Sequence, residues 1–261
     1  MRREVQPERY TRSVRSYHQY CSVARALDVV GERWTLLIVR ELMTRGACRY
    51  TDLRAGLPGI ATNLLAARLR ELEAAGVLER EEAPPPIATT LFRLTPRGLE
   101  LRPVLEALGR WGFPLMREAD EEDAFRAQWL KLPVRMFLSD SSPGEPPATI
   151  QIRAGSESAV IEVADGAVTT RLGTEPSPDA SLTGPPQLLI AVLSGRLSPE
   201  AAEEQGLRRE GSSSVLARVL PSGKAGVVAD RAVDDGGEDP QAGDAVGADR
   251  GGVFGQDREI G

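Results

Sequence analysis

The stretch from Thr62 to Ala75 carries side chains suited to contact with a nucleic-acid duplex. Leu65, Leu69 and Leu72 form an apolar stripe at helical spacing, and small and polar residues occupy the opposite side. Small side chains let a helix backbone approach another surface closely, while Asn and Arg offer hydrogen bonds to base edges and phosphates. We therefore expect a helix that lies in a DNA groove and makes contacts through Thr62, Asn63, Ala66, Ala67, Arg68 and Arg70.

Two arginines of this candidate interface need separate comment. Arg93 lies on a predicted strand and is expected to contact a phosphate. Arg68 borders the apolar stripe, so phosphate contact and intramolecular pairing with an acidic residue both remain open.

Charge is distributed unevenly along the 261 residues. Residues 1–113 carry 18 Arg and no Lys against 13 acidic residues, a balance of +5, whereas residues 114–220 and 221–261 stand at −6 and −5. A basic half beside an acidic half indicates that only the first meets a polyanion. A GC-rich genome would explain why these basic residues are arginine and not lysine, but it would not explain why positive charge is concentrated in residues 1–113.

The elements that must position these residues follow from hydrophobic spacing. Amphipathic helices are predicted from Cys21 until Gly31, over Trp34–Met43 and over Tyr50–Leu57, before the longer helix at 62–75. Alternating residues at 77–80 and 91–94 flank Pro84, Pro85 and Pro86 and predict a β-hairpin, or wing. A final helix is expected from Thr95 through Trp111.

This order of elements resembles the HxlR-type family of bacterial winged-helix regulators over residues 20–113. The resemblance is carried by Cys21, by Gly31-x-x-Trp34, by Pro58-Gly59-Ile60 leading into Arg68–Glu73, and by Leu94-Thr95 with Gly98. Glu32, Arg33, Asn63, Ala66 and Ala67 depart from the family pattern and alter the groups that face the groove. The resemblance implies a homodimer that places two helices in successive major grooves of a palindromic operator in double-stranded DNA. We expect a repressor, because repression is the commoner mode in similar proteins. The alternative is a protein-docking module that does not bind specific DNA.

Cys21 is a candidate redox or electrophile sensor, since some members of this family use a cysteine at this position. A thiol at a helix N-terminus has a lowered pKa and reacts more readily. Cysteine is equally a small buried hydrophobe, so packing alone also accounts for it. Two cysteines, Cys21 and Cys48, form no disulfide framework.

The second half changes from helical spacing to period two. Strands are predicted at 148–154, 158–163 and 168–172, with Ala164-Asp165-Gly166-Ala167 as a tight turn, and helices at 186–194 and 199–205. The motifs Pro178-Asp179-Ala180, Leu182-Thr183-Gly184 and Leu193-x-Gly195-Arg196-Leu197 resemble a sterol carrier protein type 2-like domain. That resemblance implies an apolar tunnel walled by Leu189, Ile190 and Leu193, which would bind an apolar small-molecule effector and shift the recognition helices. The alternatives are that these side chains form an ordinary core, and that this half dimerises or stabilises the protein or binds lipid without specific DNA binding.

The sequence thus predicts an α+β chain: an arm at 1–20, a winged helix-turn-helix domain at 21–116, a smaller α/β sterol-carrier-like domain at 130–220, and a disordered acidic tail at 221–261. His18 is the only histidine, which excludes His-assisted triads and most zinc sites. Phosphate-loop and dinucleotide motifs are absent, and consecutive carboxylates at Asp120–Asp123 point in different directions on a helix. We expect no enzyme activity, cofactor or metal, no membrane segment or signal peptide, and a cytoplasmic location.

Overall fold

The computed structural model describes residues 16–83, 89–116 and 123–221. These residues belong to one compact unit that contains two hydrophobic clusters, one drawn from residues between 38 and 105 and the other from residues between 127 and 219. The predicted proline turn at 84–86, the acidic run at 120–122, the arm before residue 16 and the tail beyond residue 221 lie outside the described residues. The chain is α+β, and its N-terminal part has the winged helix-turn-helix fold.

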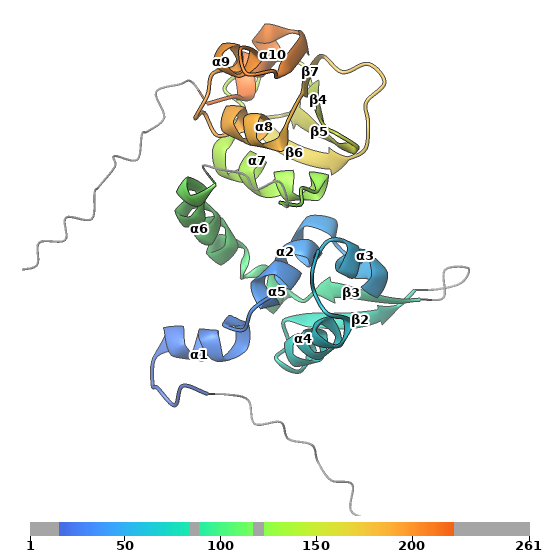
Figure 1. The fold of residues 1–261 in the computed structure, drawn as a ribbon, viewed down its shortest axis with the longest axis vertical. Helices are drawn as coiled ribbons and strands as arrows, with labels where there is room; N and C mark the ends of the chain where they lie inside the picture. The colour runs from blue at the N-terminus through green and yellow to red at the C-terminus, as the bar shows by residue number, and fades with distance from the viewer. Residues whose placement is uncertain (1–15, 84–88, 117–122, 222–261) are drawn as a thin grey trace, which may run out of the picture. The chain divides into compact units, whose positions relative to one another are not determined.

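The winged-helix region contains the predicted helices in the predicted order (Figure 1). Gly46 ends the second helix at a positive φ of 79°, which glycine adopts without strain. Two strands of the wing pair antiparallel, with Leu78 opposite Leu94. The elements are α1 (Ser22–Val30), α2 (Thr35–Arg45), β1 (Cys48–Arg49), α3 (Tyr50–Ala55), α4 (Thr62–Ala74), β2 (Leu78–Glu82), β3 (Thr90–Leu94), α5 (Pro96–Leu99), α6 (Arg102–Gly112) and the 3₁₀ turn η1 (Phe113–Leu115).

Two local expectations were wrong, and one short strand was not predicted. Trp34 precedes α2 in a left-handed conformation, so this helix begins one residue later than predicted. The predicted helix from Thr95 to Trp111 is broken into α5 and α6, because Pro103 occupies the first turn of α6, where its missing N–H leaves no bond unmade. A two-residue strand, β1, pairs with β3 and makes the wing sheet three-stranded. A strand of two residues is too short to show the alternation of apolar and polar residues from which strands are predicted.

The C-terminal region, residues 123–221, contains a five-stranded sheet in the order β6-β5-β4-β7-β8. Among the described strands of this sheet, only β4 and β7 pair in parallel. Asp165 and Gly166 both have positive φ, as the predicted tight turn between β5 and β6 requires. The first regular α-helix of this region begins at Lys131, directly after a 3₁₀ turn. The elements are η2 (Ala127–Leu130), α7 (Lys131–Phe137), β4 (Ala148–Ala154), β5 (Glu157–Ala164), β6 (Ala167–Leu172), β7 (Ala180–Thr183), α8 (Pro186–Leu193), α9 (Pro199–Glu203), β8 (Arg208–Gly211) and α10 (Ser213–Val219).

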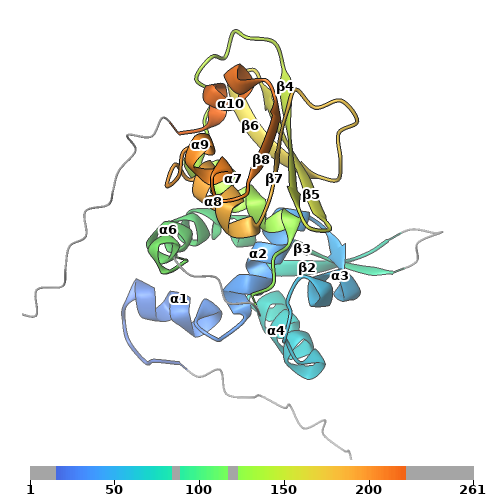
Figure 2. The same ribbon diagram turned by 45° about the horizontal axis from the view of Figure 1, so that its top comes forward.

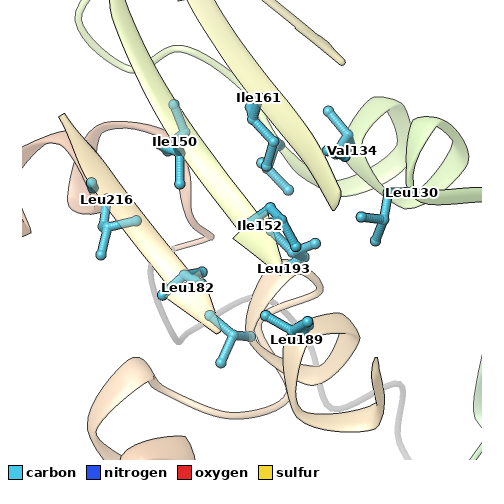
Figure 3. Close-up of a cluster of buried hydrophobic side chains, with 14 of the residues drawn as sticks. Leu130, Val134, Ile150, Ile152, Ile161, Leu182, Leu189, Leu193 and Leu216 are labelled. Atoms are coloured by element: carbon cyan, nitrogen blue, oxygen red, sulfur yellow. The ribbon is translucent and has the colours of Figure 1, made fainter. Parts of the chain in front are cut away.

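Helices of the C-terminal region pack against one face of this sheet (Figure 2). Figure 3 shows the resulting core, in which Ile150, Ile152 and Ile161 of the sheet meet Val134 of α7 and Leu193 of α8. All five side chains are buried, so the cluster is the apolar layer that holds this region together.

Candidate nucleic-acid interface

Helix α4 is anchored by its apolar stripe and presents its polar side to solvent. Leu65, Leu69 and Leu72 are each at most 2% exposed and belong to the N-terminal hydrophobic cluster. Thr62 and Arg70 are exposed on the other side. Within the described ranges, the Arg70 guanidinium has neither an ion pair nor a hydrogen bond to a protein group, so its charge is available to a ligand.

The N-terminal end of α4 is fixed by a contact that sequence reasoning missed. The hydroxyl of Tyr50, the first residue of α3, donates a hydrogen bond of 2.7 Å to the backbone carbonyl of Thr62. This bond ties α3 to the first turn of α4. Asn63 is exposed, and its Oδ1 accepts a 2.9 Å bond from the Leu64 N–H, so its amide nitrogen is free to point outward.

Ala66 and Ala67 lie halfway between the buried stripe and the exposed side, and both are partly buried. Their side chains are single methyl groups, which would let the helix backbone come close to the floor of a DNA groove. Their contacts with DNA stay a prediction.

Arg68 is paired inside the protein. Its side chain is 16% exposed, and its guanidinium donates to Glu32 at 3.1 Å and to Glu71 one turn along α4. The first bond joins α4 to the turn that precedes α2. In the structure Arg68 therefore holds α4 in place, and contact with a phosphate would require it to exchange one of these carboxylates.

Arg93 on β3 stands between two carboxylates of the neighbouring strand. Its guanidinium lies 3.0 Å from Glu79 and 3.2 Å from Glu81, and all three side chains are about half exposed. These ion pairs offset the positive charge of Arg93 on the wing. Its phosphate contact stays a prediction, and we expect it to be weaker than that of Arg70.

Arg54 is a second exposed arginine that the sequence interpretation did not single out. It lies on α3 next to the fully buried Leu53, and no ion pair or hydrogen bond holds its side chain among the described residues. The signal was present in the sequence, because Leu53 as the inward residue of a short helix directs Arg54 toward solvent.

The two cysteines differ in reactivity. Cys21 is exposed at the N-terminus of α1, where the nearby backbone N–H groups of Ala24 and Val23 lower the pKa of its thiol. Cys48 is buried, and desolvation raises the pKa of its thiol to about 12. Of the two, Cys21 therefore combines access with a favoured thiolate.

The leucines proposed to wall an apolar tunnel lie in the C-terminal core. Leu189 and Leu193 are fully buried, and Ile190 is half-buried against the same cluster. Figure 3 shows Leu189 and Leu193 directed toward the sheet. A ligand that used these side chains would have to separate α8 from the strands.

Metal-ligand clusters and membrane-spanning helices are both missing from the part of the chain that the structure describes. Nowhere in residues 16–83, 89–116 and 123–221 do three His, Cys, Asp or Glu side chains come together as metal ligands. None of the helices in these ranges has the length and apolar character needed to cross a bilayer.

Comparison with known proteins finds relatives of the N-terminal part of the chain. Residues 29–120 match the model of the HxlR-like helix-turn-helix family. The chain is 34% identical over 87 residues to the uncharacterised HTH-type transcriptional regulator YvaP of Bacillus subtilis, covering 33% of this chain and 80% of that protein. It is 32% identical over 109 residues to the regulator YdeP of the same organism, covering 41% and 82%. The crystal structure of PA1607 matches with 35% identity, a TM-score of 0.37 and coverage of 53% of this chain and 87% of that one.

The fold and the exposed polar side of α4 define a winged helix-turn-helix DNA-binding protein. The chain belongs to the HxlR-like helix-turn-helix family of transcriptional regulators.

Proposed function

We propose that the protein is a repressor that binds a palindromic operator as a homodimer, with α4 of each protomer in the major groove. The observation that supports this most directly is Arg70, which is exposed and unpaired within the described ranges on the side of α4 opposite three buried leucines. Base edges would be read by Thr62 and Asn63, and Ala66 and Ala67 would allow close approach. Arg70 and Arg54 would bind phosphates.

The dimer would form through the apolar surface of α1 and α6. Val23 and Leu27 of α1 and Val104, Leu108 and Trp111 of α6 are all more than 40% exposed, and Trp111 reaches 74%. Side chains of α6 line a shallow apolar groove. Large apolar groups left this exposed favour an interface, and a second copy of the chain supplies the two-fold symmetry that a palindromic site needs.

Selection of genomic DNA fragments by the full-length protein, followed by sequencing, tests this function. A shared site with two inverted halves about one helical turn apart is the expected result. Recovery of random fragments alone would favour the protein-docking alternative, in which the winged-helix region contacts another protein.

A thiol-based switch is a second candidate, and the exposure and lowered pKa of Cys21 favour it. Cys21 is the N-cap of α1, the helix assigned to the dimer surface, so a bulky adduct there would disturb the dimer. If alkylation of Cys21 left both dimerisation and operator affinity unchanged, this candidate would be withdrawn.

The sterol-carrier-like motifs lead to a further part of the proposal, in which an apolar small molecule binds the C-terminal region and changes DNA affinity. It would enter beside Leu189, Ile190 and Leu193 and would have to expand a closed core. An effector changes DNA affinity only if it binds one DNA-competence state more tightly than the other. Mass spectrometry of small molecules that copurify with the protein, together with operator binding in the presence of acyl and aromatic compounds, tests this part separately.

A further inference from the structure

Glu41 is a buried carboxylate that joins parts of the chain far apart in sequence. It lies on α2 and is 0% exposed. Two arginines of the same helix neutralise it: Arg40 donates to Oε1 at 3.0 Å and Arg45 donates to Oε2 at 3.1 Å. A buried charge is tolerated only when it is paired and fully hydrogen-bonded, so each donor to Glu41 matters.

Two further donors come from the C-terminal region, 87 and 88 residues away. Gln128 donates from Nε2 to Oε2 at 3.1 Å, and Trp129 donates from its indole N–H to Oε1. Both residues belong to η2, whose Ala127 and Leu130 are packed into the C-terminal core. One carboxylate therefore accepts hydrogen bonds from both parts of the chain.

The same carboxylate touches the turn between α3 and α4. Gly56 ends α3 with ordinary helical dihedrals, so glycine is not needed there for its backbone freedom. It is needed for space, because a Cβ at this position would lie 2.1 Å from Oε2 of Glu41. Glu41 is thus held between η2 on one side and the turn that leads into the recognition helix on the other.

Neighbouring contacts restrict the movement of α2 relative to η2. The Arg40 guanidinium stacks over the Trp129 ring at 4.4 Å, and Lys131 donates to the backbone carbonyl of Thr44 at the end of α2. Interiors this tightly packed and bonded respond to displacement as a unit.

We propose that Glu41 is a positioning residue that couples the C-terminal region to the α3–α4 turn. A shift of Gln128 and Trp129 moves the carboxylate, and the carboxylate presses on or releases Gly56. The coupling itself is a property of the fold; its effect on DNA affinity rests on the proposed function. It supplies a physical route between the C-terminal region and the DNA-binding side.

Amide hydrogen exchange of the full-length protein without DNA tests the coupling. Gln128→Met keeps the side-chain length and removes one donor to Glu41, and Trp129→Phe removes the other. In both variants we expect exchange at residues 53–66 to accelerate about tenfold, the size of effect that follows loss of one hydrogen bond to a buried charge. The matched control is Arg135→Gln, which removes the exposed pair between Arg135 and Glu106 and should leave these amides unchanged.

The opposite pattern would overturn the proposal. If exchange in both variants rose only at residues 127–138 and stayed at the wild-type rate at 53–66, η2 and the α3–α4 turn would not be coupled through Glu41. Protection in β4 and β5 reports that each variant is folded. Since the readout involves no DNA, a failure of the operator hypothesis would not affect it.

Discussion

Individual arginines in this protein have different roles although their residue type is the same. Arg68 and Arg93 are paired to nearby carboxylates, whereas Arg70 is exposed and unpaired within the described ranges. The sequence identified the arginines and their spacing, and it left the pairing of Arg68 open. Only the positions of Glu32 and Glu79, which lie 36 and 14 positions away from their partners in the chain, distinguish a structural arginine from one available to DNA.

At the same scale, the two thiols are expected to react at different rates. The lowered pKa of Cys21 places more of it in the thiolate form at neutral pH, so its alkylation rate should reach half its maximum below the ordinary thiol value of 9.0. Cys48, with a pKa raised to about 12, should stay unmodified in the native protein. Peptide mass mapping after iodoacetamide treatment between about pH 6 and 10, a range that brackets the ordinary thiol pKa, measures both rates. Equal labelling of the two cysteines under native conditions would contradict the assignment.

Short elements of the winged-helix region depend on capping. The Thr95 hydroxyl accepts a 3.1 Å bond from the Gly98 N–H and donates to the Gly76 carbonyl, so it joins the start of α5 to the turn after α4. Thr95→Ala should lower the free energy of unfolding by about 1 to 2 kcal/mol, the usual cost of removing an N-cap. Thr95→Ser keeps the hydroxyl and should cost less than half of that. Urea denaturation of both variants gives the comparison, and equal losses would show that the methyl group matters more than the cap.

Elements with a strong period were predictable, and those set by distant contacts were not. The strand at 148–154 and the turn at Asp165-Gly166 follow from alternation and from residues that adopt positive φ. In contrast, β1 is a strand only because Cys48 pairs with the distant Phe92 of β3. Glu41 gave no signal either, because a lone acid in an amphipathic helix usually faces solvent, and its partners are far away in the sequence.

At the scale of the whole molecule, the exposed apolar surface of α1 and α6 predicts the oligomeric state. Trp111 is the most exposed side chain of this surface on α6, so Trp111→Asp places a charge within the proposed interface. This variant should shift the protein from dimer to monomer in light scattering at micromolar concentration. Leu172→Asp is the matched control, since Leu172 is also an exposed apolar residue but lies on β6 of the C-terminal sheet. A dimer that persists in the Trp111 variant and dissociates in the Leu172 variant would show that the interface lies on the C-terminal sheet instead.

The salt dependence of operator affinity in Arg70→Ala is the most direct measurement of the central claim. Removing one phosphate contact should reduce the slope of log affinity against log salt by about 1, so a dimer without Arg70 in either protomer should show a slope smaller by about 2. Arg153→Ala, a change to an exposed arginine of the C-terminal sheet, should leave the slope unchanged. An Arg70 variant with the affinity and slope of the wild type would show that this side of α4 does not face DNA.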